Sequence, residues 1–466
     1  RAGPAGGHGR VQGRGAGTVL PRGPGVANGI ANLHNARRAR TPIVNIIGDH
    51  TSWHLPYDAP LSSDIESLAR PVSGWVHRIA DTLEVARAAA EAVAQTQCNG
   101  GQGATLIFPA DFQAKPVPSH AQAAQARTIV PNQPVRWDLD ATVAALRQSR
   151  KTVFLLGGGG ERSGLGARAQ QAVARLCQAR AASAYAESFP SRAERGQGLP
   201  VFDRLPDYPE PARAVLDDAD CVVLVGALAP ITYFGYEGHP SLLVPAERQL
   251  PLCAPGADAV ERLEALAEAF QAPAYQPPQL ALPELPEGAL TPKKIAATLT
   301  RRLPAQAIVS VEGGTCGYPF YAASAGAARH TALTNTGGAI GQGLPVAMGA
   351  AIASPDRRAV PPLSDGSTQY TIQTLWSMAH ENLNVVVLVA ANHQYAILRN
   401  ELRRGGQTLS DKALSMTALD GPRIDWVGLA HSYGVQACRA ETAQELDAAL
   451  QQAFERRGPT LIEMAL

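Results

Sequence analysis

The sequence predicts an α/β protein built from three doubly wound, parallel-sheet domains. The first observation is that short apolar runs, of the length of buried strands, alternate with amphipathic helical segments along the whole chain. The second is that two proline-rich stretches, 113–135 and 271–292, lack apolar periodicity and suit extended linkers. Alternating strands and helices favour parallel sheets covered on both faces. We therefore expect domains at 1–128, 136–270 and 290–466.

The composition is that of a soluble globular protein. Of its 466 residues, 45% are hydrophobic and 17% are charged, and the formal net charge is +1. No overall electrostatic field therefore favours nucleic acid or an acidic membrane. No apolar run has the roughly 18 residues of a membrane span, and the six cysteines lack the CxxC spacing of a zinc site. We expect a cytoplasmic protein that binds neither nucleic acid nor membrane.

The first 48 residues contain seven arginines but no aspartate or glutamate. A transit peptide shares this bias but is also rich in serine, whereas the first serine here is Ser52. The arginines are not interleaved with aromatic residues, as they would be in a nucleic-acid-binding arm. Residues 25–50 instead suggest a helix followed by a strand, so we favour a folded segment.

The individual domains repeat the pattern of strands and helices. In the first domain, TPIVNII and GATLIFPAD read as buried strands on either side of an amphipathic helix, TLEVARAAAEAVAQT. In the second, KTVFLL leads through a glycine turn into a helix, and DADCVVLVGA is a further strand. In the third, AIVSVEGG, NVVVLVAAN and GPTLIEMAL read as strands, separated by helical segments such as TIQTLWSMAHEN.

The segment AVPPLSDGS in the third domain reads as a short strand that runs into a turn. Pro361 and Pro362 are poor strand residues and suggest an edge strand or an irregular entry. Asp365 would lie at the carboxyl end of this strand, and Asn392 at the end of the next parallel strand, 27 residues later. Ligands of open α/β sheets bind at that edge. We therefore expect the two side chains to share one site.

Asp365 and Asn392 suit a magnesium diphosphate site. Their oxygens, together with a nearby backbone carbonyl, are the hard ligands that Mg²⁺ prefers, and they leave positions for phosphate oxygens. A helix that opens after Ser367 would point free N–H groups at a phosphate. Taken alone, each half of this pattern is better explained by an Asp-Gly turn or an unrelated loop asparagine. The prediction therefore depends on their combination.

The combination of SDGS and VAANHQY resembles the thiamine diphosphate motif, in which GDG is followed, after a spacer, by NN. The resemblance implies that Asp365 and the Asn392 side chain hold Mg²⁺, with the backbone carbonyl of Gln394 as third ligand. Ser364 replaces the usual first glycine and Ala391 the first asparagine. The segments YAIL and NELRRGG resemble the acetolactate synthase large-subunit-like and benzoylformate decarboxylase-like group of the thiamine diphosphate-dependent superfamily.

Two further segments of the third domain extend the resemblance. NTGGAIGQGLPVAMGAAIA resembles the segment that bends the cofactor, which would be the role of Ile340 unless it is an ordinary core residue. VEGGTCG resembles the loop that contacts the diphosphate, and Cys316 within it reads as a packing residue. The cofactor-binding residues that the resemblance implies are Gly314, Thr315, Gly338, Ile340, Asp365, Gly366, Ser367, Asn392, Gln394 and Tyr395.

Residues 23–50 resemble the pyrimidine-binding domain of this superfamily. His50 and His54 could line the substrate cavity, although surface and core histidines are commoner. The superfamily uses a glutamate of this domain to activate the cofactor, and its place falls at or before Arg1, since no carboxylate precedes Asp49. We therefore expect either a first domain that is incomplete at its N-terminus or a chain that has lost this residue, and the catalytic residue stays unknown.

Gly157–Gly160 follow a strand of the second domain and suggest a dinucleotide site. Their spacing does not fit GxGxxG, and the sequence places no acidic residue at the expected position on a second strand. The resemblance implies instead the central domain of these enzymes. That domain binds FAD in some acetolactate synthases and nothing in others, so FAD stays open as a less favoured cofactor.

The resemblance implies thiamine diphosphate- and Mg²⁺-dependent decarboxylation of a pyruvate-type 2-oxo acid, followed by carboligation, as in acetolactate synthase. The alternatives are a simple benzoylformate-type decarboxylase and a cofactor-binding relative without activity, because the activating glutamate is not found. A nucleotide-binding module is a third. The implied partners are a small 2-oxo acid and further copies of the chain, as a homodimer or homotetramer, since members of the superfamily enclose each cofactor between subunits.

Overall fold

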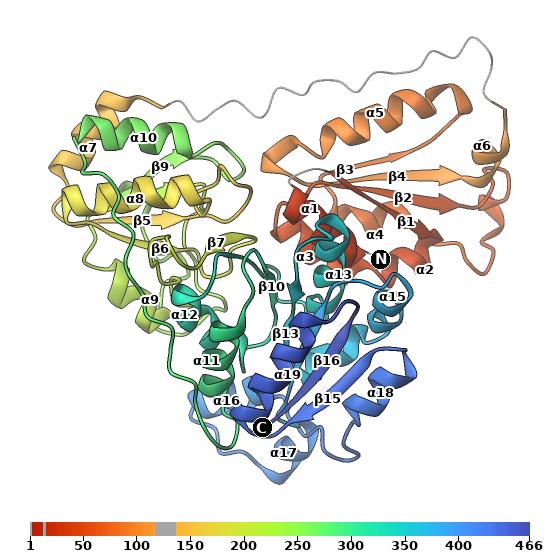
Figure 1. Ribbon diagram of the computed structural model, residues 1–466. Helices are drawn as coiled ribbons and strands as arrows, with labels where there is room; N and C mark the ends of the chain where they lie inside the picture. The colour runs from red at the N-terminus through yellow and green to blue at the C-terminus, as the bar shows by residue number, and fades with distance from the viewer. Residues whose placement is uncertain (1, 13–14, 117–136) are drawn as a thin grey trace. The chain divides into compact units, whose positions relative to one another are not determined.

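The computed structural model has the α/β architecture that the sequence predicts (Figure 1). It describes residues 2–12, 15–116 and 137–466. The chain forms two compact units: residues 1–194 with 199–277, and residues 195–198 with 278–466. The three predicted domain boundaries stay a prediction, and most of the first predicted linker, 113–135, lies outside the described residues.

The first sheet lies in the first unit and has the strand order β1-β2-β4-β3, with parallel pairing throughout. It contains both predicted strands of the first domain, because their apolar runs are long enough to fill the centre of a sheet. The sequence analysis missed its two outer strands, which are shorter or more exposed. The strands are β1 (Ala16–Pro21), β2 (Ile43–Asp49), β3 (Trp75–Arg78) and β4 (Gly103–Pro109).

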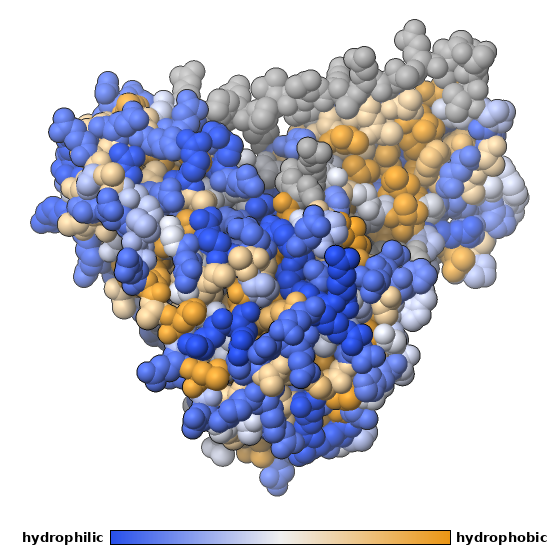
Figure 2. All heavy atoms as spheres, in the orientation of Figure 1, coloured by the Kyte–Doolittle hydropathy of each residue, from blue (hydrophilic) through white to orange (hydrophobic). Residues whose placement is uncertain are grey.

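Helix α5 (Val85–Gln95) covers part of one face of this sheet through its buried alanines, Ala88 and Ala92. Beside it, an apolar groove of about 390 Å³ is lined by residues of β1, β2, β4 and α5, among them Ile46 and Val93. Val19 on β1 is 66% exposed. Figure 2 shows hydrophobic side chains gathered over this part of the first unit.

The second sheet of the first unit has the strand order β6-β5-β8-β9 and is also parallel. Its strands are β5 (Thr152–Leu156), β6 (Ser183–Ala186), β8 (Cys221–Val225) and β9 (Gln249–Cys253). The helices of the first unit are α1 (Ala2–Gln12), α2 (Arg22–Ala27), α3 (Ile30–Arg38), α4 (Ile65–Ala69), α5, α6 (Ala110–Ala114), α7 (Leu139–Gln148), α8 (Ala167–Arg180), α9 (Pro209–Leu216) and α10 (Val260–Ala269).

The glycine turn after β5 differs from the prediction in one respect. Glu187 directly follows β6, the strand next to β5, so an acidic residue does lie at the end of a second strand. The short, half-polar β6 gave no periodic signal. The Glu187 carboxylate accepts a hydrogen bond from the Gly158 N–H at 2.6 Å, and burial raises its pKa to about 7. The protein's own carboxylate therefore takes up an N–H group of the turn.

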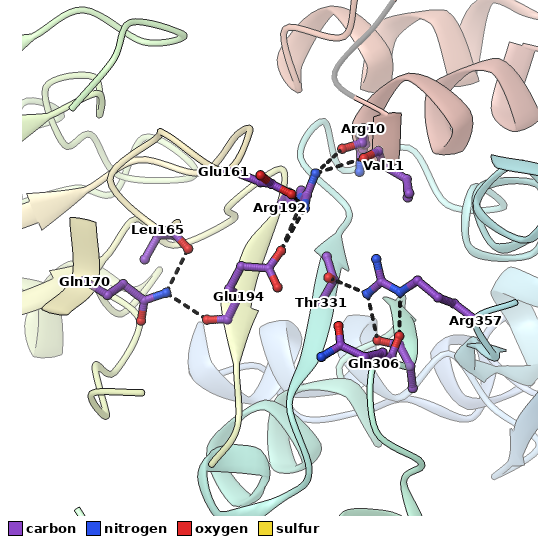
Figure 3. A network of polar contacts seen from close by, with 11 residues as sticks. Arg10, Val11, Glu161, Leu165, Gln170, Arg192, Glu194, Gln306, Thr331 and Arg357 are labelled. Carbon is purple, nitrogen blue, oxygen red and sulfur yellow. Dashed lines mark hydrogen bonds and ion pairs between the residues drawn. The ribbon is translucent and has the colours of Figure 1, made fainter. Parts of the chain in front are cut away.

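Arg192 forms a polar network in the first unit (Figure 3). Its guanidinium donates to the carbonyls of Arg10 and Val11 at 3.2 and 3.0 Å and to Glu194 at 2.9 Å. Arg192 is only 6% exposed. These hydrogen bonds satisfy the buried charge and fix the end of α1.

The second unit holds two further groups of paired strands, in the orders β12-β10-β11 and β13-β14-β16-β15. Their strands are β10 (Ile308–Val311), β11 (His330–Thr334), β12 (Ala359–Val360), β13 (Pro362–Ser364), β14 (Val386–Ala391), β15 (Gln436–Ala440) and β16 (Thr460–Ala465). The short strand β7 (Ala193–Arg195) lies where the chain passes from the first unit to the second. The irregular entry predicted at the prolines is confirmed. Residues 359–360 pair with β10, the strand breaks at Pro361, and residues 362–364 pair with β14.

Helices cover both faces of the strands in the second unit, as double winding requires. On one face, α11 and α19 pack on β14 and β16 through residues such as Leu299 and Leu446. On the other face, α13, α15 and α18 pack through residues such as Leu375 and Trp426. The helices are α11 (Pro292–Arg302), α12 (Gly317–Ala323), α13 (Gly343–Ala353), α14 (Asp365–Thr368), α15 (Thr374–His380), α16 (Ala396–Arg404), α17 (Asp411–Met416), α18 (Trp426–Ser432) and α19 (Ala443–Glu455).

Arg357 ties the turn before β12 to the neighbouring strands of the second unit. It donates to the Gln306 carbonyl at 2.6 Å and to the Thr331 hydroxyl at 2.7 Å (Figure 3).

None of the helices in the described ranges has the length and apolar character that a bilayer span demands.

An ion pair joins α11 to α19 and provides a stability prediction. Arg302 donates two hydrogen bonds to the Asp447 carboxylate, at 2.5 and 2.6 Å, and these lower the pKa of Asp447. Because Arg302 is 37% exposed, we expect Arg302→Gln to destabilise the second unit by only about 1 kcal/mol at pH 7. A lowered carboxyl pKa contributes stability above its unfolded value and loses it as the pH falls through the folded value.

The difference between wild type and Arg302→Gln should therefore shrink as the pH falls below about 4. Urea denaturation of both proteins across this range measures it. A difference that stays constant with pH would show that Asp447 does not stabilise the unit through its charge.

Candidate functional site

The ends of β13 and β14 place Asp365 beside the segment that contains Asn392. Ser364 pairs with Ala390 across the two strands, so both chains leave the sheet at the same edge. Asp365 is 2% exposed. Its carboxylate accepts hydrogen bonds from its neighbour Gly366 N–H at 2.8 Å and from His393 N–H at 2.6 Å. The two halves of the sequence motif therefore meet in the folded chain.

The Asn392 side chain links β14 to the end of β10. Its amide nitrogen donates to the Thr315 hydroxyl at 3.2 Å, and its amide oxygen accepts from the Gln394 N–H at 3.1 Å. Thr315 belongs to the loop that follows β10. The structure thus brings Asp365, Asn392, Gln394 and Thr315 together from three strand ends.

Arg399 holds the segment that follows Asn392. Its guanidinium donates to the side-chain oxygen of Gln394 and also to the Thr417 hydroxyl at 2.8 Å. The Tyr395 N–H donates to the Thr417 carbonyl at 2.9 Å. Since its side-chain oxygen is engaged in this way, Gln394 offers its backbone carbonyl as the candidate metal ligand.

The two departures from the motif are accommodated locally. A Cβ atom on Gly313 would lie 2.3 Å from the Ser364 hydroxyl oxygen, so the glycine at 313 makes room for the serine at 364. Ala391 is fully buried in the core beneath the site. Gly366 is needed as a glycine, because a Cβ there would lie 2.6 Å from the Tyr395 ring.

The helix predicted over TIQTLWSMAHEN is shorter than expected. Helix α14 already begins at Asp365, a 3₁₀ turn follows over Gln369–Thr371, and α15 begins only at Thr374. The hydroxyls of Ser367 and Thr368 both donate to the Ser364 carbonyl, at 3.0 and 2.7 Å. These bonds start the helix early, and the Ser367 hydroxyl is engaged within the chain.

Gly338 and Ile340 lie on the loop 335–342, between β11 and α13. Ile340 is 39% exposed, so it is not the ordinary core residue that the sequence left open. The Thr371 hydroxyl donates to the Gly341 carbonyl at 2.9 Å, which connects this loop to the segment that follows Asp365. Gly314 lies on the neighbouring loop, next to the Tyr318 ring.

Sequence reasoning missed Glu312, the buried residue that follows β10. It accepts hydrogen bonds from the loop 335–342 and from the start of α13. The available signal was an acidic residue between an apolar strand and a glycine pair.

Cys316 was expected to be a packing residue. Burial raises the pKa of its thiol to about 12, so this thiol is neutral at pH 7, as a packing residue would be.

The donor set around Asp365 suits a hard divalent cation. Burial raises the pKa of Asp365, which the N–H groups of Gly366 and His393 oppose, and a bound cation would favour the ionised form. In the described part of the chain, no group of three or more His, Cys, Asp or Glu residues could hold a metal. A metal site here therefore depends on amide, carbonyl and phosphate oxygens beside one carboxylate.

The two candidate histidines lie in the first unit, after β2. The Arg22 guanidinium is 3.1 and 3.2 Å from the two ring nitrogens of His50, and the rings of His50 and His54 are 5.5 Å apart. His54 also lies 5.8 Å from the Tyr57 ring. The structure thus places both histidines in one polar and aromatic cluster at the carboxyl end of the first sheet.

Comparison with known protein families agrees with this geometry. Residues 2–68 match the thiamine pyrophosphate enzyme N-terminal TPP binding domain, and residues 313–464 match the corresponding C-terminal TPP binding domain. Together with the relatives described next, these matches show that the chain belongs to the thiamine pyrophosphate (thiamine diphosphate) enzyme family. The resemblance seen in the sequence is confirmed.

A Mycobacterium tuberculosis protein provisionally named acetolactate synthase large subunit IlvX is 42% identical over 475 residues, covering 100% of this chain and 89% of the relative. Benzoylformate decarboxylase of Pseudomonas aeruginosa is 28% identical, and the match covers 99% of this chain and 89% of the relative. The fold matches a thiamine diphosphate-dependent 4-hydroxybenzoylformate decarboxylase of Rhodococcus jostii RHA1 with a TM-score of 0.84 at 24% identity, covering 100% and 90%.

Proposed function

We propose that this chain is a thiamine diphosphate- and Mg²⁺-dependent enzyme that decarboxylates a pyruvate-type 2-oxo acid and transfers the remaining fragment to a second carbonyl, as acetolactate synthase does. The observation that carries this proposal is the meeting of Asp365, Asn392 and Thr315 at three adjacent strand ends. The 42% identity to the M. tuberculosis relative supports the synthase class.

The residues of the second unit divide the work of holding the cofactor. Asp365, Asn392 and the Gln394 carbonyl would hold Mg²⁺, and the backbone of Gly314 and Gly366 would lie against the diphosphate. Ile340 would support the bend of the cofactor, with Gly338 giving its loop the necessary turn. When bound, thiamine diphosphate supplies an electron sink for cleavage of the bond between the carboxylate and the carbonyl carbon.

A second candidate function is simple decarboxylation of a benzoylformate-type 2-oxo acid. The 28% identity to benzoylformate decarboxylase over 99% of the chain favours it. A third is a relative that binds the cofactor without turnover, since none of the residues described above is assigned to proton transfer with the cofactor.

The central sheet and the assembly complete the proposal. In the glycine turn, the Gly158 N–H donates to the Glu187 carboxylate and is not available to a diphosphate, which disfavours FAD at that place.

We infer a homodimer or homotetramer, because a cofactor site of this family is built from two subunits. The small 2-oxo acid is the remaining partner. All six cysteines are free thiols, which suits a reducing, cytoplasmic location.

Turnover with two substrates tests the proposal. The purified chain, supplied with thiamine diphosphate and Mg²⁺, is incubated with pyruvate or with benzoylformate, and CO₂ release and products are followed by NMR. Acetolactate from pyruvate is expected. Benzaldehyde alone would favour the decarboxylase, and cofactor binding without CO₂ from either substrate would favour the relative without activity.

A further inference from the structure

Glu312 is a buried carboxylate that reaches across to the start of α13. It is 2% exposed and follows the last residue of β10. Its two oxygens accept hydrogen bonds from the Gln342 N–H at 3.0 Å and the Gly343 N–H at 2.8 Å. The N–H groups at the start of this 11-residue helix are therefore hydrogen-bonded to a carboxylate of the protein itself.

Asn335 extends this contact through the loop 335–342. Its side-chain nitrogen lies 3.3 Å from the Glu312 carboxylate and donates to the Ala339 carbonyl at 2.9 Å. Its side-chain oxygen accepts from the Gly338 N–H at 2.9 Å. Asn335 therefore links residues of the loop through its side-chain hydrogen bonds, and Glu312 holds the Asn335 side chain in place.

Close packing limits the alternatives for this loop. Gly341 has a φ of +90°, and a Cβ on it would lie 2.5 Å from the Tyr370 Cβ. A Cβ on Gly343 would lie 2.9 Å from the Glu312 carboxylate. Ile340, which is 39% exposed, therefore lies between Asn335 and Gly341, two positions that are held by hydrogen bonds and by close packing.

A buried carboxylate without a cationic partner is costly for folding, so its presence needs a reason. The groups that reach Glu312 in the described chain come from the loop 335–342 and α13, and all are uncharged. A neutral glutamine could not accept from every one of these N–H groups, because half of its side-chain head is itself a donor.

We propose that Glu312 is the positioning residue of the loop 335–342, and that through Asn335 it holds Ile340 in the place where a bent cofactor needs support. This inference rests on the proposed function for the identity of the ligand. The bracing of the loop is a property of the chain without cofactor, so the two can be tested separately.

Protonation of Glu312 provides a readout that a merely structural contact would lack. Burial raises its pKa to about 7, against the opposing effect of the N–H groups of Gly343, Gln342 and Gly341 and of Asn335. Above this pH the ionised carboxylate accepts from all its partners. Below it, the protonated oxygen becomes a donor and loses part of its accepting capacity, so the loop should loosen.

The first test compares amide hydrogen exchange at pH 8, without cofactor, in wild type, Glu312→Gln and Glu463→Gln. The control residue, Glu463, is also buried at 6% exposure with a raised pKa, but it lies on β16 and makes no hydrogen bond to the loop. We expect peptides covering 335–343 to exchange about tenfold faster in Glu312→Gln and unchanged in the control. Equal protection in Glu312→Gln and wild type would overturn the proposal.

If Glu312→Gln does not fold, Asn335→Ala takes its place. This change leaves the bonds from Glu312 to α13 intact. It should speed exchange around Gly338 while the amide of Gly343 stays protected, and protection that is unchanged at both positions would overturn the proposal.

The second test measures the dissociation constant of thiamine diphosphate with Mg²⁺ at pH 8 and pH 6. We expect Glu312→Gln to bind about tenfold more weakly than wild type at pH 8 and within about twofold at pH 6. A ratio that does not change with pH would overturn the titration of Glu312 as the cause. If wild type does not bind the cofactor at either pH, the proposed function fails, whereas the exchange result still decides the role of Glu312.

Discussion

Replacing Asp365 with asparagine is expected to weaken Mg²⁺-dependent binding of thiamine diphosphate by at least about 100-fold, or about 3 kcal/mol. Asparagine keeps the shape of the side chain and one oxygen but removes the charge. Asp365 is the only carboxylate assigned to the metal in the described residues, and its buried position leaves little water to compensate for the loss. Calorimetric titration of both proteins with the cofactor, at saturating Mg²⁺, measures the difference.

Asp356→Asn is the matched control for this experiment. Asp356 lies in an exposed turn of the same unit, outside the site. Its replacement removes the same charge and should leave the affinity unchanged. If Asp365→Asn bound the cofactor as tightly as the control, Asp365 would not be a metal ligand.

Leu388→Ala is expected to destabilise the second unit by about 3 kcal/mol. Leu388 is fully buried on β14, the strand that leads to Asn392, and it packs in the core formed with α11 and α19. Its strand is paired on both sides, with β13 and β16, so the backbone cannot move to fill the cavity. Urea denaturation followed by far-UV circular dichroism would show the loss as a lower midpoint.

The control for this change is Leu282→Ala. Leu282 is 39% exposed and lies before α11 in the same unit. It should cost less than about 1 kcal/mol. Equal losses for the two variants would mean that β14 is not part of a close-packed core.

The strands in the middle of the sheets could be predicted from sequence, whereas several short or exposed ones could not. Strands such as β5 and β14 are continuous apolar runs, because both of their faces are buried. β6 and β15 are short, half-polar and only partly buried, so their pairing depends on neighbours that are distant in sequence. No periodic signal marks such strands.

The two halves of the site could be predicted because they stand at strand ends with a recognisable spacing. The bracing of the loop 335–342 could not, since Glu312 contacts partners 23 to 31 residues away that no local pattern announces. The predicted start of the following helix, after Ser367, was wrong, because the helix already begins at Asp365. It depends on hydroxyl groups that bond back to Ser364, a choice between helix and turn that composition does not determine.

The most direct test of the central claim is calorimetric titration of the wild-type chain with thiamine diphosphate, first with Mg²⁺ and then after EDTA. The geometry of Asp365, Asn392 and Gln394 predicts saturable binding that requires the metal and disappears on chelation. Binding that is unaffected by EDTA, or no binding with Mg²⁺ present, would contradict the magnesium diphosphate site.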